Sequence, residues 1–317
     1  MTHKRSYAII GTGAVGGLYG ARLQQAGHDA HFLVHGDIDH VRAHGLRVES
    51  PWGDVALPCV HAYGQAEDLP PCDVVCVCLK TTHNHLLPRL LPAALRPGGA
   101  LVLMQNGLGA EEEAAQWFPE ARIAGAMCFL CSNKVGPGHI RHVDYGRILF
   151  GAYSPDMDET LRGIAGDFEA AGVPVQIAPS LGEARWRKLF WNIPYNGLSV
   201  VLQSETDEIM GHPATRELSE ALMREVLKGA RACGHDIEDG FVAEILDFTE
   251  KMKPYRTSMM LDFLARRPLE IEYIYERPLE AARRPGAVLP RIDALRAQLR
   301  FLDDRNRRES ADSNPRE

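Results

Sequence analysis

The sequence predicts an α/β protein of two domains, in which a doubly wound parallel sheet is followed by a mostly α-helical domain. Strand-like apolar runs alternate with helical patterns over the first half of the chain, which is typical of a parallel sheet covered by helices. After Leu181 the strand signals almost disappear, while apolar residues recur with helical spacing. The length of 317 residues also favours two domains over one.

Each element of the first domain has its own signal. Short apolar runs predict strands, and apolar residues at every third or fourth position predict helices. Gly27, Gly45 and Pro97-Gly98-Gly99 stand where helices should stop. The expected strands span residues 6–10, 29–34, 73–79, 100–104, 122–127 and 173–177. The expected helices span residues 14–26, 38–44, 83–95, 109–118 and 156–171.

The pattern changes after about residue 130, where short β-like pieces are separated by turn signals. These pieces indicate antiparallel strands that extend one edge of the sheet. A turn-rich break at residues 178–182 predicts the domain boundary, so the domains are expected to span 1–179 and 180–302. Residues 303–317 are polar and poor in apolar side chains, which predicts a flexible tail.

Composition and charge exclude several classes of protein. Lys and Arg total 35 against 42 Asp and Glu, and the resulting formal charge of −7 argues against a nucleic-acid coat. The apolar run in residues 1–10 is too short for a signal peptide or a membrane span. Seven cysteines, an odd number, lie mostly in apolar runs, as expected of small buried side chains in a reducing compartment. We therefore expect a cytoplasmic protein without a nucleic-acid or membrane partner.

A glycine-rich turn follows the first strand and opens the first helix. It consists of Gly11, Thr12, Gly13, Ala14, Val15 and Gly16. In such a turn the first glycine permits the tight bend, the second lets backbone N–H groups approach a pyrophosphate, and the third allows close packing of helix on strand. The helix N-terminus adds the positive end of its dipole. The first domain is therefore expected to be Rossmann-like and to bind a dinucleotide.

The residues after the second strand indicate which dinucleotide is bound. An acid at the strand end would bond the adenosine ribose, whereas a basic residue there would accept a 2′-phosphate. No acid occupies the strand end, and Asp37 follows two or three residues late. His35, helped by Arg42 on the next helix, is placed to face a phosphate, which favours NADP. The alternative is a surface histidine that contacts no ligand.

Lys188, Asn192 and Asn196 lie at positions i, i+4 and i+8 of one expected helix, so one face carries a cation and two amides. Burial in a cleft lowers the pKa of a lysine toward neutrality. Such a lysine can protonate the alkoxide that forms when a bound nicotinamide transfers hydride to a carbonyl group. Pro194 is expected to kink this helix because it lacks a backbone donor. A lysine whose head group reaches solvent between two surface amides remains the alternative.

Six motifs, in order over nearly the whole chain, resemble those of the ketopantoate reductase (2-dehydropantoate 2-reductase) family. They are GTGAVGG, CLKTTHNH with Lys80, QNGLG with Asn106, KLFWN, SMMLD with Ser258, and LEIEYI with Glu270. The resemblance implies NADPH-dependent reduction of a 2-oxo acid to a 2-hydroxy acid, with ketopantoate giving pantoate in pantothenate biosynthesis. The active site would lie in the cleft between the domains.

The resemblance also implies the roles of individual residues. Lys188 would be the general acid, and Glu270 would orient it or bond the substrate hydroxyl. The substrate carboxylate and hydroxyl would be held by Asn192, Asn196 and Ser258. The nicotinamide side would be lined by Lys80 and by Asn106, which would also contact the substrate.

Four residues depart from the family's pattern. His35 stands where the family commonly has an arginine, and Tyr275-Glu276 replaces an Asn-Gly pair. Tyr255 replaces a small polar residue three positions before Ser258. Together these changes point to a reshaped pocket, as in a paralogous reductase of another 2-oxo acid.

Two other functions remain open. A β-hydroxyacid dehydrogenase type of enzyme shares the Lys-x3-Asn face, but the Ser258 and Glu270 motifs argue against it. A non-catalytic dinucleotide sensor would need neither Lys188 nor Glu270.

Sites for metals and partner chains have weaker signals. The CxxC spacing of Cys128 and Cys131 lacks a second pair, and His83 and His85 lack nearby carboxylates, so no metal site is predicted. The helical domain offers faces on which a homodimer could form.

Overall fold

The computed structural model describes residues 4–312, and the chain divides into two compact units. The first unit comprises the residues up to 106 together with 110–181, and the second comprises residues 107–109 together with those from 182 onward. The predicted boundary at residues 179 and 180 lies two residues before this division, and the short excursion at 107–109 has no signal in the sequence. Within the described residues, no helix combines the length and apolar character that crossing a membrane requires.

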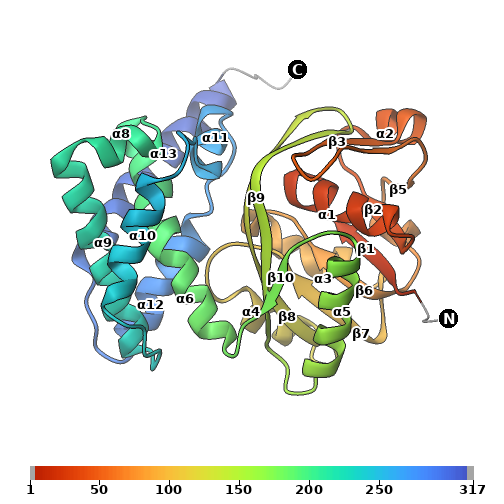
Figure 1. Cartoon of the computed structure of the whole chain (residues 1–317), viewed down its shortest axis with the longest axis horizontal. Coiled ribbons are helices and arrows are strands. Elements are labelled where there is room, and N and C mark those ends of the chain that lie inside the picture. The colour runs from red at the N-terminus through yellow and green to blue at the C-terminus, as the bar shows by residue number, and fades with distance from the viewer. Residues whose placement is uncertain (1–3, 313–317) are drawn as a thin grey trace. The chain divides into compact units, whose positions relative to one another are not determined.

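The first unit is built on one ten-stranded sheet (Figure 1). Its strands are β1 (Ser6–Ile10), β2 (Asp29–Leu33), β3 (Leu46–Glu49), β4 (Val55–Leu57), β5 (His61–Tyr63), β6 (Cys72–Val77), β7 (Leu95–Leu103), β8 (Arg122–Gly136), β9 (His139–Ala152) and β10 (Val175–Ile177). Their order is β4-β3-β9-β8-β7-β6-β1-β2-β5, and β10 pairs with β9. The run from β8 through β7, β6, β1 and β2 to β5 is parallel, whereas β8 and β9 form a long antiparallel hairpin.

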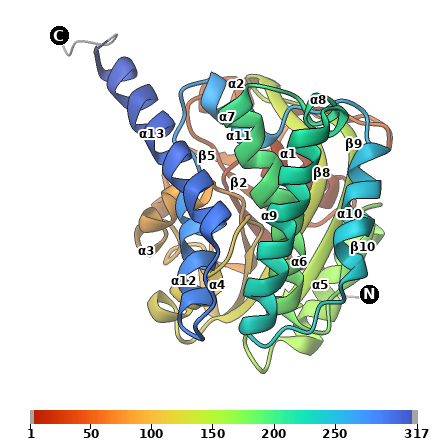
Figure 2. The ribbon, with the colours of Figure 1, turned by 90° about the vertical axis from the view of Figure 1, so that its left-hand side faces the viewer.

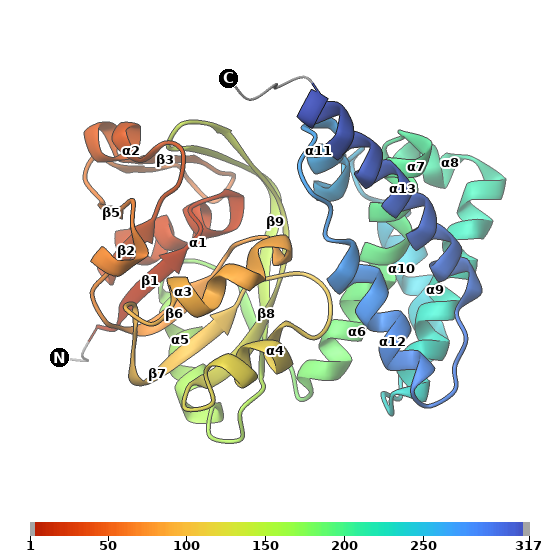
Figure 3. The same ribbon diagram turned by 180° about the vertical axis from the view of Figure 1, so that it is seen from behind.

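Helices cover both faces of this sheet. They are α1 (Ala14–Gln25), α2 (Ile38–His44), α3 (Leu87–Leu90), α4 (Ala110–Trp117) and α5 (Asp158–Ala170), with two 3₁₀ turns, η1 (Ala66–Asp68) and η2 (Thr81–Leu86). The helices α1 and α5 contact each other, and Figure 3 shows α3 and α4 in front of the sheet when it is seen from behind. Buried side chains such as Ile9, Leu18 and Phe32 fill the core. The predicted doubly wound α/β domain is confirmed.

Three expectations for this unit are wrong in detail. The strands β3, β4 and β5 were not expected, because runs of three or four residues are too short to show alternation. As a result, the β8–β9 hairpin does not form the edge of the sheet, since β3 and β4 lie beyond β9. The helix expected over 83–95 is mostly a 3₁₀ turn and the four-residue α3, because Pro92 has no N–H to donate to the preceding turn and so ends the helix.

The second unit is helical, as predicted (Figure 2). Its elements are α6 (Leu181–Trp191), the π-helical turn η3 (Asn192–Asn196), α7 (Gly197–Leu202), α8 (Thr206–Gly211), α9 (Pro213–Ala232), α10 (Gly240–Glu250), α11 (Ser258–Leu264), a second π-helical turn η4 (Glu272–Glu276), α12 (Arg277–Arg283) and α13 (Pro290–Asp312). The core of this unit contains Trp186, Phe190, Leu222 and Tyr275, which are almost fully buried. Trp186, the largest of these side chains, anchors the packing of this unit.

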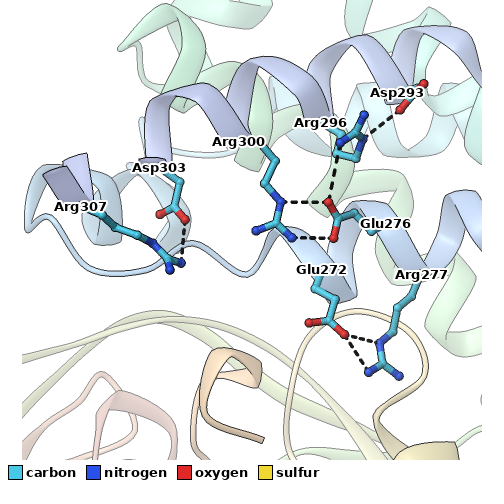
Figure 4. Close-up of polar contacts among 8 residues, drawn as sticks. All are labelled: Glu272, Glu276, Arg277, Asp293, Arg296, Arg300, Asp303 and Arg307. Atoms are coloured by element: carbon cyan, nitrogen blue, oxygen red, sulfur yellow. Dashed lines mark hydrogen bonds and ion pairs between the residues drawn. The ribbon is translucent and has the colours of Figure 1, made fainter. Parts of the chain in front are cut away.

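The flexible tail predicted over 303–317 is wrong for residues 303–312, which continue α13. Composition alone does not reveal why these residues are ordered. Two of their polar side chains are buried and form hydrogen bonds with residues of the core. The carboxylate of Asp303 is 1% exposed, accepts the backbone N–H of Leu269 at 3.1 Å, and pairs with Arg307 at 2.8 Å (Figure 4). The amide of Asn306 donates to the carbonyl of Phe263 at 2.9 Å. Residues 313–317 lie outside the described part of the chain.

Replacing Asp303 with alanine should lower the free energy of unfolding by about 2–3 kcal/mol, because the buried N–H of Leu269 would lose its acceptor. Urea denaturation of the parent and the variant measures this difference. The exposed neighbour Asp304 provides the matched control, since Asp304→Ala should change stability by less than about 0.5 kcal/mol. Equal stabilities of the two variants would mean that the helix end is held by something other than this bond.

Candidate active site

The glycine-rich turn between β1 and α1 has the geometry of a pyrophosphate cradle. Gly11 has a φ of +100°, and a Cβ at Gly16 would lie 2.2 Å from the carbonyl oxygen of Gly11. In contrast, a Cβ at Gly13 would meet nothing within 4 Å, so space is open above the turn. No side chain caps the N-terminus of α1, which leaves that role to a ligand. These observations fit a bound dinucleotide.

The other expected cofactor residues follow neighbouring parallel strands. Lys80 comes after β6, Asn106 after β7 and His35 after β2, and these strands flank β1 in the order β7-β6-β1-β2. The carboxyl ends of parallel strands meet at one edge of a sheet, so the structure brings these residues to the same edge as the glycine-rich turn. All three side chains are partly or fully exposed to solvent.

Gln105 ties two of these loops together and is a residue that the sequence did not single out. Its amide nitrogen donates to the carbonyl of Leu79 at 2.8 Å and to Oδ1 of Asn84 at 2.7 Å. These bonds fix the loop after β7 to the loop after β6. Lys80 directly follows Leu79, and Asn106 directly follows Gln105, so both expected cofactor residues are next to a residue held by these bonds. Thr12 similarly ties the glycine-rich turn to β2 through a 3.0 Å bond to the carbonyl of Leu33.

In the second unit, Lys188 lies on α6, and Asn192 and Asn196 bound the π-helical turn η3. The expected kink at Pro194 is therefore a change from α- to π-helical bonding, which accommodates a residue without an N–H. Lys188 is partly exposed, whereas Asn192 and Asn196 are 3% and 2% exposed. Oδ1 of Asn196 is buried and accepts no hydrogen bond within residues 4–312, as expected of a group that awaits a ligand.

Ser258 is the first residue of α11, which packs against η3. A buried chain of hydroxyl groups connects the two elements. Thr257 and Ser199 bond through their side-chain oxygens at 2.7 Å, and Ser199 donates to the carbonyl of Asn196 at 3.1 Å. Thr257 also caps α11 by accepting the N–H of Met260. The predicted residues Ser258 and Asn196 are thus held by neighbours that sequence reasoning missed.

Glu270 is 4% exposed and lies two residues before η4, which contacts η3. Tyr275 joins the two π-helical turns, because its hydroxyl donates to the carbonyl of Ile193 at 2.9 Å. A Cβ on Gly197 would lie 2.7 Å from that hydroxyl, so only glycine leaves the tyrosine its place. Burial raises the pKa of Tyr275 well above its usual value, which keeps the hydroxyl protonated and able to donate.

The departures at Tyr275 and Glu276 now have structural explanations. Tyr275 is fully buried in the core, and Glu276 is bound by Arg300 at 2.9 and 2.5 Å, with Arg296 at 3.7 Å (Figure 4). Glu276 therefore fixes η4 to α13. The backbone N–H of Tyr255 donates to Oγ1 of Thr206 at 3.2 Å, its carbonyl accepts the N–H of Thr206 at 3.3 Å, and its ring centroid lies 6.4 Å from that of Trp191. Tyr275 and Glu276 therefore contribute to the packing among η3, η4 and α13.

Cysteine and histidine side chains form no metal site within residues 4–312. All seven cysteines are free, and burial raises the pKa of the Cys72 thiol to about 12 and holds that of the Cys78 thiol well above its usual value, so these two thiols are poor nucleophiles. Cys128 and Cys131 lie on β8, and His83 lies on η2 next to the hydroxyl of Thr82. Over the part of the chain that the structure describes, no group of three or more His, Cys, Asp or Glu residues is arranged to hold a metal ion.

Comparisons with known proteins cover both units. Residues 7–155 match the family "Ketopantoate reductase PanE/ApbA", and residues 180–303 match its C-terminal domain. A 2-dehydropantoate 2-reductase from Nostoc is 51% identical over 310 residues, which cover 96% of this chain and 97% of the relative. A crystal structure of 2-dehydropantoate 2-reductase from Geobacter metallireducens is 39% identical, with a TM-score of 0.91, over 93% of this chain and 99% of the other. The ternary structure of D-mandelate dehydrogenase with NADH and anilino(oxo)acetate has the same fold at 18% identity, with a TM-score of 0.86 over 95% of this chain and 99% of the other.

Proposed function

Because the chain belongs to the ketopantoate reductase family, we propose that it reduces 2-dehydropantoate (ketopantoate) to pantoate with NADPH. The observation that carries this function is the 51% identity to a 2-dehydropantoate 2-reductase along almost the whole of both chains. The enzyme is an NADP-dependent oxidoreductase, and its reaction belongs to pantothenate biosynthesis.

NADPH, when bound, supplies the hydride for the keto carbon, so the protein must hold the 2-oxo acid and deliver one proton. We assign the proton to Nζ of Lys188, whose transfer neutralises the alkoxide as it forms. Glu270 orients this ammonium or accepts the hydroxyl of the product. The buried amides of Asn192 and Asn196, with the Ser258 hydroxyl, hold the substrate carboxylate and hydroxyl through neutral donors and acceptors.

The cofactor side of the proposal rests on the first unit. Residues 11–16 hold the pyrophosphate, because the space above Gly13 and the uncapped α1 N-terminus suit an anion. Lys80 and Asn106 line the nicotinamide side, and Asn106 also contacts the substrate. His35 faces the 2′-phosphate from the loop after β2.

A panel of 2-oxo acids tests this function. Oxidation of NADPH, followed by its absorbance, should have the highest kcat/KM with 2-dehydropantoate and a lower kcat/KM with other 2-oxo acids. A higher kcat/KM with another member of the panel would identify a paralogous reductase. Absence of turnover with every member would leave the dinucleotide sensor as the better interpretation.

Tyr275→Phe should raise KM for the 2-oxo acid about fivefold and change kcat much less, because Tyr275 supports the turn that carries Asn192 and Asn196. Lys188 lies on the preceding α-helix and should keep its place. Steady-state kinetics separate the two constants. Tyr153→Phe, at an exposed tyrosine of the first unit, is the control and should leave both unchanged. A fall in kcat with an unchanged KM would contradict this positioning role.

We further propose that the chain forms a homodimer and works in the cytoplasm. Leu264, Val288 and Phe301 of the second unit are each more than half exposed, and such apolar side chains favour association. The seven free cysteines suit a reducing compartment. Light scattering coupled to size-exclusion chromatography tests the dimer, and a mass of 35.1 kDa would contradict it.

A further inference from the structure

Lys134 is a cation at the cofactor edge of the sheet that the sequence did not single out. It lies near the end of β8, which with β9 forms a hairpin in the first unit (Figure 1). Its Nζ donates to the carbonyl of Thr12 at 3.2 Å and to Oδ1 of Asp37 at 2.7 Å. The ammonium therefore bridges the glycine-rich turn after β1 and the loop after β2. These two loops flank the adenosine end of a dinucleotide in a Rossmann-like domain.

Asp37 is committed to holding this lysine. Its second oxygen, Oδ2, accepts the backbone N–H of Gly138 at 2.8 Å, and its side chain is 11% exposed. Burial alone would raise the pKa of this carboxyl, but the bonds from Lys134 and Gly138 outweigh it and lower the pKa. A carboxylate after the second strand accepts the ribose 2′-hydroxyl in NAD sites. Here the protein's own groups occupy both oxygens of that carboxylate.

The Lys134 ammonium keeps capacity for a ligand. An ammonium has three N–H donors, and Thr12 and Asp37 account for two of them. The Lys134 side chain is 28% exposed, so the third donor is within reach of solvent. His35 lies two residues before Asp37 and is exposed. The exposed His35 and the carboxylate that anchors Lys134 thus belong to the same loop after β2.

We propose that Lys134, held in place by Asp37, binds the 2′-phosphate of NADPH together with His35 and sets the preference for NADP over NAD. This inference rests on the proposed function only for the identity of the cofactor. A charge-assisted hydrogen bond from an ammonium is strong enough to discriminate a 2′-phosphate from a hydroxyl. The fixed position of Nζ also lowers the entropic cost of forming that bond.

Isothermal titration with two cofactor fragments tests the proposal without turnover. Adenosine 2′,5′-bisphosphate carries the 2′-phosphate, and ADP has the pyrophosphate but lacks it. The parent should bind the bisphosphate more tightly than Lys134→Ala does by about tenfold, while the affinity for ADP changes less than about twofold. Lys134→Arg should retain most of the affinity for the bisphosphate. Lys4→Ala is the matched control, because Nζ of Lys4 also donates to a carbonyl, that of Ala26, but at the opposite end of β1.

The outcomes separate this inference from the proposed function. If Lys134→Ala binds the bisphosphate as tightly as the parent does, the assignment of Lys134 is wrong, whereas the choice of NADPH stands. If the variant loses both fragments equally, Lys134 acts only on the shape of the turn, and the proposal also fails. If the parent itself binds NADH as tightly as NADPH, the NADPH preference in the proposed function fails together with the inference.

Discussion

Lys188→Ala should lower kcat for 2-oxo acid reduction about a thousandfold and leave the affinity for NADPH within about twofold of the parent. General acid catalysis contributes about 10²–10⁴-fold to a rate, and no other cation among the residues assigned to the substrate can replace the proton. The residues assigned to the cofactor belong to the other unit of the chain, so the affinity of the enzyme for NADPH should not depend on the Lys188 side chain. Steady-state oxidation of NADPH and fluorescence titration of NADPH measure the two quantities.

Arg187→Ala is the matched control for this experiment. Arg187 is the adjacent residue on α6, but it is paired with Glu183 at 2.7 Å and with Glu238 at 2.8 Å. Like Lys188→Ala, Arg187→Ala removes one positive charge from α6, but it should change kcat less than about threefold. Equal losses in the two variants would show that charge or helix stability, and not the Lys188 proton, supports the rate. A Lys188→Ala enzyme with the parent's kcat would falsify the assigned acid.

What could be predicted from the sequence depended on how local the signal is. The glycine-rich turn, α1 and α2 are specified by residues close together in the chain, and the structure has them where the pattern places them. The helical second unit is predictable for the same reason, since apolar spacing repeats within each helix. In contrast, β3, β4 and β5 are held by pairing with distant strands and carry too few residues to show a period.

The supporting contacts of the site were missed because they join residues far apart in sequence. Lys134 reaches Thr12 and Asp37 across about a hundred residues, and Tyr275 reaches Ile193 across about eighty. Tyr275 and Glu276 were predicted to reshape the pocket from their size and charge alone. In the fold, the size of Tyr275 is absorbed by the space at Gly197, and the charge of Glu276 is balanced by Arg300. Residue type alone does not indicate which way a side chain faces within a π-helical turn.

Residues 303–312 show the same limit, because the sequence predicts disorder where the structure has a helix. Residues 303–312 contain few apolar side chains, so composition predicts disorder. Their order comes from buried polar groups, of which Asp303 holds the backbone just before Glu270. The C-terminal part of α13 therefore supports the segment that carries a proposed catalytic residue. A change in this helix is expected to affect activity as well as stability.

Gly13→Ala should raise the Kd for NADPH about tenfold to a hundredfold with little change in stability. Nothing in the protein lies within 4 Å of the added methyl group, so its only neighbour would be the bound pyrophosphate. Gly16→Ala should differ, because its methyl group would lie 2.2 Å from the Gly11 carbonyl oxygen and 2.8 Å from Cγ2 of Ile9. Such overpacking should lower the free energy of unfolding by about 1–3 kcal/mol and distort the turn, so NADPH binding should also weaken.

Gly166 provides the control for the variants at Gly13 and Gly16. Gly166 on α5 also has no atom within 4 Å of an added Cβ and lies away from the turn, so Gly166→Ala should leave the Kd for NADPH unchanged. Alanine should also raise stability slightly at this helical position, by about 0.5–1 kcal/mol. Fluorescence titration and urea denaturation of the three variants then separate loss of the ligand's space from loss of the fold. If Gly13→Ala binds NADPH as Gly166→Ala does, the open space above the turn does not hold the pyrophosphate.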